Sequence, residues 1–216
     1  MNILFDLDGT LTDPKLGITN CIRFALKKLN EDVPEDLDWC IGPPLQDSFS
    51  ELLKDKRQVD SAVDFYRERF KEVGMFENLL YDDIEECLKK VKNSGHHLFL
   101  ATSKPIVYAS EILKYFKLST YFNSEYGSEL DGTRKDKTDL IKYILDEESL
   151  NSMETIMVGD RKHDLIGAEN NNVHKVGVSY GYGSIVELNA CSPKFIANNP
   201  LDLSEYLLGF EKRNMK

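Results

Sequence analysis

Three aspartates lie close together near the start of the chain, in the segment FDLDGTLTD. Asp6 and Asp8 are two residues apart and come directly after the apolar run NILF, and Asp13 follows five residues later. Residues two apart on an extended segment face the same side of it. Like charges in such a position repel, and they stay ionised only if they remain solvated or meet a cation. One carboxylate of such a pair could attack as a nucleophile while the other transfers protons.

Two later apolar runs also end in polar side chains. The run LFLATSKP ends with Thr102, Ser103 and Lys104, and the run ETIMVGD ends with Asp160, which Asp164 follows four residues later. Carboxylate oxygens suit a hard divalent cation such as Mg2+, and hydroxyls with a lysine suit a phosphate. A metal, a phosphate and a spare carboxylate together indicate phosphoryl transfer, with an aspartate as the covalent acceptor.

These clusters can act together only if the fold brings them to one place. From about residue 82 onwards, short apolar runs alternate with segments of helical periodicity, as in IEECLKKVKNSG followed by HHLFLATSKP. This alternation predicts an α/β fold with a doubly wound parallel sheet, whose ligands bind outside the carboxyl ends of the strands. We therefore expect Asp6, Asp8 and Asp160 to hold Mg2+ at one edge of the sheet.

A helical block interrupts the alternation after the first strand. We predict a catalytic core made of residues 1–13 and 82–216, and a helical cap, residues 14–81, inserted into it. Apolar residues recur at helical spacing in three stretches of this cap, residues 17–29, 46–54 and 59–73.

Charge and composition exclude several classes of protein. The chain has 216 residues and a net charge of -10, with 37 acidic against 27 basic side chains, so it is not expected to bind a nucleic acid polymer. Its four cysteines include no C-x-x-C pair, which predicts neither a zinc site nor a disulfide framework. No apolar run is long enough to span a bilayer. We expect a cytoplasmic protein with no membrane partner, either a monomer or a homodimer.

Four motifs, FDLDGTLTD, LFLATSKP, KTDLIKYIL and VGDRKHD, occur in this order along most of the chain. With them the chain resembles the haloacid dehalogenase-like hydrolases, whose core is Rossmann-like. The segments DPKLGITNCIRFAL, IGPPLQDSF and GVSYGYGS are similar to the phosphoglycolate phosphatase-like branch, which carries a helical cap after the first strand. That branch often has Pro-Gly where this chain has Asp82-Asp83, at the connection into the core.

The resemblance implies roles for individual residues. Asp6 would be the nucleophile and Asp8 the general acid and base. Thr102 would contact the phosphate, with Ser103 beside it, and Asp160 would bind Mg2+. The two hydroxyls could instead cap the helix that is expected to begin near residue 106.

The family also places a lysine on the phosphate, and the segment TRKDKTDLI offers Lys135 and Lys137. Lys137 comes directly before an expected helix start, where its charge would add to a helix N-terminus that already favours anions. We therefore predict Lys137. Asp164 is expected to hold a metal-bound water or the lysine, or else to cap the following helix.

The expected activity is Mg2+-dependent hydrolysis of a phosphomonoester through an aspartyl phosphate. A cap predicts a small substrate, because a lid must exclude bulk water. In the resembling branch the cap segment Gly42, Pro43 and Pro44 faces the active site, so it is expected to contact the substrate. The resemblance implies a phosphoglycolate-like metabolite. Nucleoside monophosphates, a sugar-phosphate mutase of the same family and a signalling receiver domain are the alternatives, and Asp8 favours turnover by water.

Overall fold

The computed structural model describes residues 1–214, with side chains up to Phe210, and the chain forms two compact units. The larger, here called the core unit, comprises Met1–Thr12 and the chain from Leu80 onwards; the smaller, the inserted unit, is Asp13–Leu79. The chain passes between the units at two short strands, β2 (Thr12–Asp13) and β3 (Leu79–Leu80). The sequence places these crossings after residues 13 and 81, slightly further along the chain.

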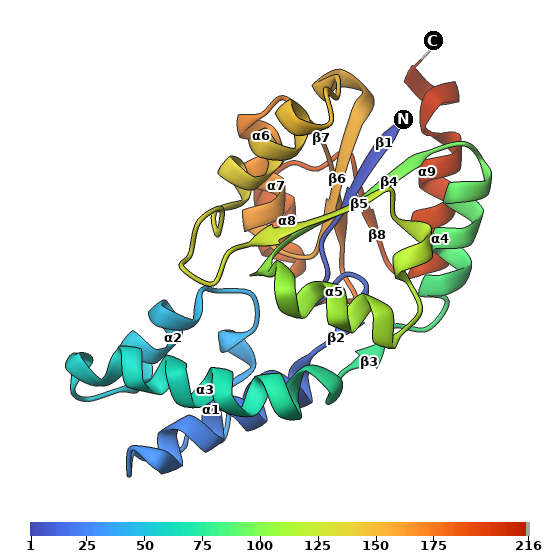
Figure 1. Cartoon of the computed structure of the whole chain (residues 1–216). Coiled ribbons are helices and arrows are strands. Elements are labelled where there is room, and N and C mark those ends of the chain that lie inside the picture. The colour runs from blue at the N-terminus through green and yellow to red at the C-terminus, as the bar shows by residue number, and fades with distance from the viewer. Residues whose placement is uncertain (215–216) are drawn as a thin grey trace. The chain divides into compact units, whose positions relative to one another are not determined.

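A six-stranded sheet forms the centre of the core unit (Figure 1). Its strand order is β5-β4-β1-β6-β7-β8, and every neighbouring pair is parallel. Strand β6 is buried along its whole length, as expected of a strand covered on both faces. The strands are β1 (Asn2–Phe5), β4 (His97–Pro105), β5 (Ser124–Ser128), β6 (Thr155–Gly159), β7 (His174–Val178) and β8 (Phe195–Ala197).

Helices cover both faces of this sheet, which confirms the predicted doubly wound α/β fold. Helices α6 and α7 pack together on one face, and α4 and α9 pack together on the other (Figure 1). A buried cluster that includes Leu4, Phe99 and Ile141 lies between the sheet and α6. The helices are α4 (Ile84–Asn93), α5 (Ile106–Tyr115), α6 (Lys137–Glu147), α7 (Lys162–Asn170), α8 (Ile185–Ala190) and α9 (Pro200–Asn214), with 3-10 turns η4 (Ser119–Tyr121) and η5 (Ser152–Glu154).

The inserted unit is helical, as the sequence predicts, and has its own core. Helices α1 and α3 pack against each other, and α2 packs against α3. Phe49, Tyr66 and Phe70 fill the space between them, with the last two rings stacked at 5.3 Å. The elements are α1 (Lys15–Lys28), η1 (Asp38–Cys40), α2 (Leu45–Leu52), η2 (Lys56–Gln58), α3 (Val59–Glu72) and η3 (Gly74–Phe76). Among residues 1–214, no helix combines the length and the apolar character needed to cross a membrane.

Strand register brings the polar clusters to one edge of the sheet. Phe5, the last residue of β1, is level with Leu100 of β4 on one side and with Val158 of β6 on the other. The segments that follow these residues therefore leave the sheet side by side. Strand β4 continues to Pro105, with a break in its pairing to β5 after Thr102.

Candidate active site

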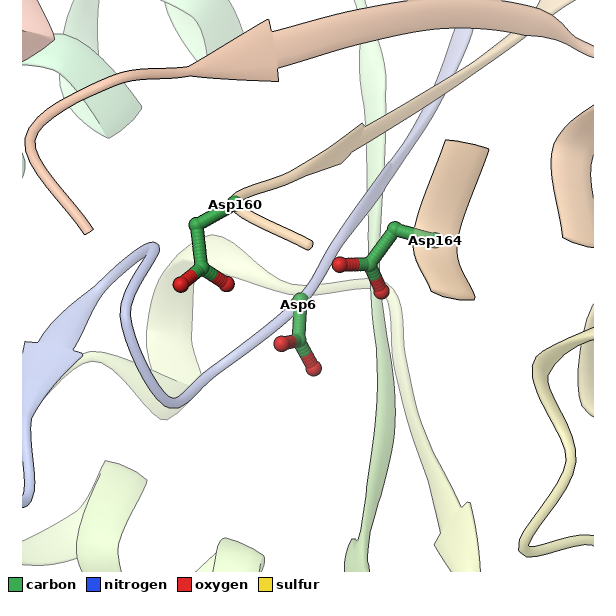
Figure 2. A group of neighbouring side chains, drawn as sticks. All are labelled: Asp6, Asp160 and Asp164. Carbon is green, nitrogen blue, oxygen red and sulfur yellow. The ribbon is translucent and has the colours of Figure 1, made fainter. Parts of the chain in front are cut away.

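Asp6 occupies the centre of a group of three buried carboxyl groups. It follows β1 directly, Asp160 follows β6, and Asp164 lies in the first turn of α7. One oxygen atom of each residue lies within 4.8 Å of the others. In Figure 2 Asp6 lies between Asp160 and Asp164. Parallel pairing of β1 with β6 puts the first two carboxyl groups next to each other, and the turn into α7 brings the third.

Lys137 joins this group from the neighbouring helix. Its Nζ lies 2.8 Å from Oδ1 of Asp6 and 2.7 Å from Oδ1 of Asp164, and it donates to the carbonyl of Ala101 at 2.6 Å. Burial by itself would lower the pKa of Lys137, but the two carboxylates outweigh it and raise that pKa above its usual value. Lys137 is therefore an ammonium ion held inside the protein. Lys135, the other lysine considered from the sequence, is exposed.

The position of Lys137 follows from local structure. Asp136 precedes it as the N-cap of α6, and the Asp136 carboxylate accepts hydrogen bonds from the backbone N–H groups of Thr138 and Asp139 at 2.8 and 3.4 Å. Lys137 is the first residue of the helix, and it lies over Gly167 of α7, where a Cβ atom would come within 2.8 Å of the lysine Cβ. A larger residue at 167 would push the two helices apart or displace the lysine.

Asp160 has one oxygen atom that the protein does not satisfy. Its Oδ2 accepts a hydrogen bond from the backbone N–H of Tyr182 at 2.8 Å, whereas its Oδ1 is buried with no partner among residues 1–214. Burial, together with the charges of Asp164 and Asp6, raises the pKa of Asp160 well above its ordinary value. A buried carboxylate oxygen without a partner is costly, and a cation bound there would remove that cost.

Asp164 is bound on two sides. Its Oδ2 accepts a hydrogen bond from the backbone N–H of Arg161 at 3.1 Å, which caps the start of α7, and its Oδ1 faces Lys137. Burial raises the pKa of Asp164, the positive charge of Lys137 lowers it, and the negative charge of Asp6 raises it. Together these effects raise the pKa of Asp164 to about 6. The residue therefore does both things that the sequence suggested as alternatives, since it caps the helix and holds the lysine.

Asp8 is held apart from the three-carboxylate group. Its Oδ2 lies 2.6 Å from Nζ of Lys104, and the close group contains Asp164 where the sequence suggested Asp8. Burial raises the pKa of Asp8, and the charge of Lys104 offsets part of that rise. The sequence grouped Lys104 with Thr102 and Ser103 as side chains suited to a phosphate, and the ion pair between Lys104 and Asp8 was not anticipated.

The hydroxyl residues of β4 lie next to this pair. Thr102 is buried, and its Oγ1 accepts a hydrogen bond from the backbone N–H of Lys104 at 3.2 Å. Ser103 is half-buried, and its carbonyl accepts from the hydroxyl of Ser128 at 2.8 Å. Thr102 directly follows Ala101, whose carbonyl accepts from Lys137, so it lies within a residue of the Lys137 contact.

The cap segment predicted to touch substrate lies at the start of a helix in the inserted unit. Gly42 has a φ of +102°, a conformation that favours glycine. Pro44 is the N-cap of α2, and Pro43 lies between them. Contact of this segment with a substrate remains a prediction.

A glycine-rich loop that follows β7, residues 179–184, packs against Asp160. A Cβ atom at Gly181 would lie 2.2 Å from the carbonyl oxygen of Gly9 and 2.4 Å from Cβ of Asp160. A Cβ atom at Gly183 would lie 1.9 Å from the carbonyl oxygen of Asp160. Only glycine fits at these positions without movement of the backbone. Sequence reasoning used the segment GVSYGYGS for its resemblance alone, although its two alternate glycines signalled a close backbone approach.

The chemistry of the donor set fits a hard divalent cation. All three close residues offer carboxylate oxygen, which Mg2+ prefers, and Mg2+ is commonly held by one or two carboxylates with waters completing its shell. Asp160 has a free buried oxygen, and Asp6 leaves one oxygen beyond its contact with Lys137. Asp160 and Asp6 would hold the ion, and Asp164 would hold Lys137 and a water of the metal.

Comparison with known proteins identifies the family of this chain. The family model described as haloacid dehalogenase-like hydrolase matches residues 3–178. A 5'-nucleotidase of Pseudomonas aeruginosa is 49% identical over 195 residues, which cover 89% of this chain and 88% of that protein. A phosphoglycolate phosphatase of Colwellia psychrerythraea is 24% identical over 204 residues, covering 89% of this chain and 90% of that protein.

A solved structure has the same fold along nearly the whole chain. The crystal structure of a predicted phosphatase from Clostridium acetobutylicum superposes with a TM-score of 0.90 at 44% sequence identity, covering 96% of this chain and 97% of that one. The similarity therefore includes both the core unit and the inserted helical unit.

Proposed function

The chain belongs to the haloacid dehalogenase-like hydrolases and is a phosphatase of that family, and from this premise we propose that it hydrolyses small phosphomonoesters with Mg2+ and an aspartyl phosphate on Asp6. One observation carries the proposal. Asp6 lies 2.8 Å from the ammonium group of Lys137 and close to Asp160, whose Oδ1 is buried without a partner among the described residues. A nucleophile flanked by a fixed positive charge and a metal site suits attack on a dianionic phosphate.

The first half of the reaction forms a bond from a carboxylate oxygen of Asp6 to phosphorus and breaks the bond from phosphorus to the ester oxygen. The departing oxygen takes a proton from Asp8, whose raised pKa favours the protonated form needed for this step. In the second half Asp8 accepts a proton from a water molecule as that water attacks phosphorus. The bond from phosphorus to Asp6 then breaks, and inorganic phosphate is released.

Charge stabilisation comes from groups that the fold holds in place. Lys137, fixed by Asp164 and by the carbonyl of Ala101, neutralises oxygens of the phosphoryl group. The hydroxyl of Thr102 is one residue further along β4 and donates to the same group. Bound Mg2+ would supply further positive charge to the phosphoryl oxygens and to the nucleophile.

We propose nucleoside 5'-monophosphates as the substrate class. The support is the 49% identity to a 5'-nucleotidase over nearly the whole chain, against 24% identity to a phosphoglycolate phosphatase. Phosphoglycolate is the second candidate because that more distant similarity also spans most of both chains. A sugar-phosphate mutase would use the same aspartyl phosphate and return the phosphoryl group to a second hydroxyl.

A panel of phosphate esters tests this choice. Purified protein with Mg2+ is given nucleoside 5'-monophosphates, phosphoglycolate and sugar phosphates, and released phosphate is measured as kcat/KM. An Asp6→Asn variant prepared in the same way reports any contaminating phosphatase. The highest kcat/KM is expected for a nucleoside monophosphate. A higher value for phosphoglycolate would replace the proposed substrate, and isomerisation of a sugar phosphate without phosphate release would indicate a mutase.

A further inference from the structure

Glu187, in the first turn of α8, connects two segments that carry the acidic group. Its Oε1 accepts a hydrogen bond from Nε of Arg161 at 2.9 Å and another from the backbone N–H of Lys162 at 2.8 Å. Its own backbone N–H donates to the hydroxyl of Ser184, the N-cap of α8, at 3.1 Å. One side chain therefore ties the start of α7 to the start of α8.

The turn from β6 into α7 carries two of the three close carboxyl groups, those of Asp160 and Asp164. Arg161 follows Asp160 in the chain, and its backbone N–H donates to Asp164. The backbone N–H of Asp164 in turn donates to the carbonyl of Arg161 at 3.2 Å. The contacts of Glu187 with Arg161 and Lys162 thus hold the short turn that separates Asp160 from Asp164.

The glycine-rich loop 179–184 ends at the start of α8 and packs against Asp160. The backbone N–H of Tyr182 donates to Oδ2 of Asp160. A Cβ atom at Gly181 would clash with the Asp160 side chain, and one at Gly183 would clash with the Asp160 carbonyl oxygen. The contacts form a closed ring that runs from Asp160 through the loop to Glu187 and back through Arg161. Within this ring Oδ2 of Asp160 is engaged and Oδ1 is left without a partner.

Burial and charge strengthen the contacts that Glu187 makes with Arg161 and Lys162. The Arg161 and Glu187 side chains are 17% and 19% exposed, so water screens their ion pair only partly. Burial alone would raise the pKa of Glu187, but the hydrogen bonds from Arg161 and Lys162 outweigh it and lower that pKa. The carboxylate is therefore ionised at neutral pH, and hydrogen bonds to an ionised acceptor are stronger than those between neutral groups.

We propose that Glu187 is a positioning residue that sets the affinity of the acidic group for its divalent cation, acting through Arg161 and the loop 179–184. The proposal rests on the proposed function, in which this group binds Mg2+. Among the described residues, no hydrogen bond or ion pair joins Glu187 to the three carboxyl groups or to Lys137. Glu187 holds the turn between Asp160 and Asp164 in place. It also holds the loop 179–184, which in turn positions the Asp160 side chain. Outer partners of metal ligands typically change metal affinity by about 10–100-fold.

The test compares Mg2+ binding by Glu187→Ala, Glu187→Gln and the wild-type chain. Isothermal titration calorimetry on the full chain gives the dissociation constant for Mg2+ without substrate, and activity at increasing Mg2+ gives a second value. We expect Glu187→Ala to bind Mg2+ about 10-fold more weakly or worse, with kcat largely restored at saturating Mg2+. Glu187→Gln keeps the size of the side chain and loses its charge, so a smaller loss is expected.

The matched control is Glu169→Ala. Glu169 lies on the same helix α7 and pairs with Lys175 at 3.1 Å, away from the turn that carries the carboxyl groups. Because the Glu169 side chain is 63% exposed, its removal should leave the Mg2+ dissociation constant within about twofold of the wild-type value. A Glu187→Ala variant that binds Mg2+ as tightly as Glu169→Ala would overturn the proposal.

Two outcomes separate this proposal from the proposed function. If the wild-type chain binds Mg2+ and both Glu187 variants bind it as tightly as the wild type, the role of Glu187 is overturned and the proposed function stands. A wild-type chain that binds no Mg2+ and stays active in excess chelator overturns the metal requirement, and the role of Glu187 with it. If Glu187→Ala does not fold, Glu187→Gln decides the matter, because it preserves packing and removes only the charge.

Discussion

The ammonium group of Lys104 lies 2.6 Å from Oδ2 of Asp8, while a different ammonium group, that of Lys137, lies 2.8 Å from Oδ1 of Asp6. Each carboxylate of the D-x-D pair thus has a lysine of its own. The two lysines come from different elements, the end of β4 and the start of α6. These two ion pairs offset the repulsion expected between two neighbouring acids, and they leave Asp6 within the three-carboxylate group and Asp8 outside it.

Asp8→Asn should damage turnover of an alkyl phosphate far more than turnover of an activated aryl phosphate. The amide cannot give a proton to the departing alcohol, and proton transfer is typically worth about 10²–10⁴-fold. An aryl leaving group departs without that proton, so the loss with it should be much smaller. Equal losses of kcat with the two esters would remove Asp8 from the acid role.

Lys137→Ala should lower kcat/KM by at least about 100-fold, because a preorganised charge at the phosphoryl group is lost. It should also destabilise the fold by about 3–5 kcal/mol, since Asp6 and Asp164 would be left buried without their cation. Lys135→Ala is the matched control, because Lys135 is exposed two residues earlier. Steady-state kinetics and urea unfolding of both variants check the prediction, and similar mild effects of the two would contradict it.

Asp6→Asn should abolish turnover, because an amide cannot become the phosphoryl acceptor. Activity should fall by more than about 1,000-fold, as is usual when a covalent nucleophile is removed. Acid quenching during turnover of a radiolabelled substrate should trap labelled phosphate on the wild-type protein and none on the variant. Label retained by Asp6→Asn would mean that a different residue accepts the phosphoryl group.

Mg2+ binding should strengthen as the pH rises from 5 to 7. The folded-state pKa of Asp164 is raised to about 6, and burial together with the charges of Asp164 and Asp6 raises the pKa of Asp160 well above its ordinary value. In metal-free protein these groups therefore keep their protons at pH values where unfolded chains have lost them. Their stabilising contribution is therefore present at low pH and is lost as the pH rises through the folded pKa values. Mg2+ competes with the same protons.

Calorimetric titrations at pH 5, 6 and 7 check this expectation, with thermal unfolding in Mg2+ or in chelator alongside. The increase in melting temperature caused by Mg2+ should grow with pH. Asp160→Asn is the control, since it removes a carboxylate of the site and should abolish both the binding and its pH dependence. Affinity that is independent of pH would place the ion elsewhere.

Local sequence patterns are enough to predict the fold class and the strands and helices that carry the reactive side chains. Apolar runs that end in Asp6, Thr102 and Asp160 are local patterns, and each predicts a strand with a polar residue at its carboxyl end. Because β1 pairs with both β4 and β6 in register, polar residues at the ends of these strands meet at one edge. The helical insertion was also readable, since helical periodicity is local.

Tertiary structure alone decided which of these side chains face each other. Asp164 lies in the acidic group and Asp8 beside Lys104, although the sequence suggested Asp8 for the metal. The contact of Glu187 with Arg161 spans 26 residues of sequence. Such pairings depend on side-chain rotamers and on how helices and loops pack. The spacing of residues within one segment of the sequence predicts neither. The ends of strands follow from the local sequence pattern, whereas the partner of each charged side chain depends on three-dimensional packing.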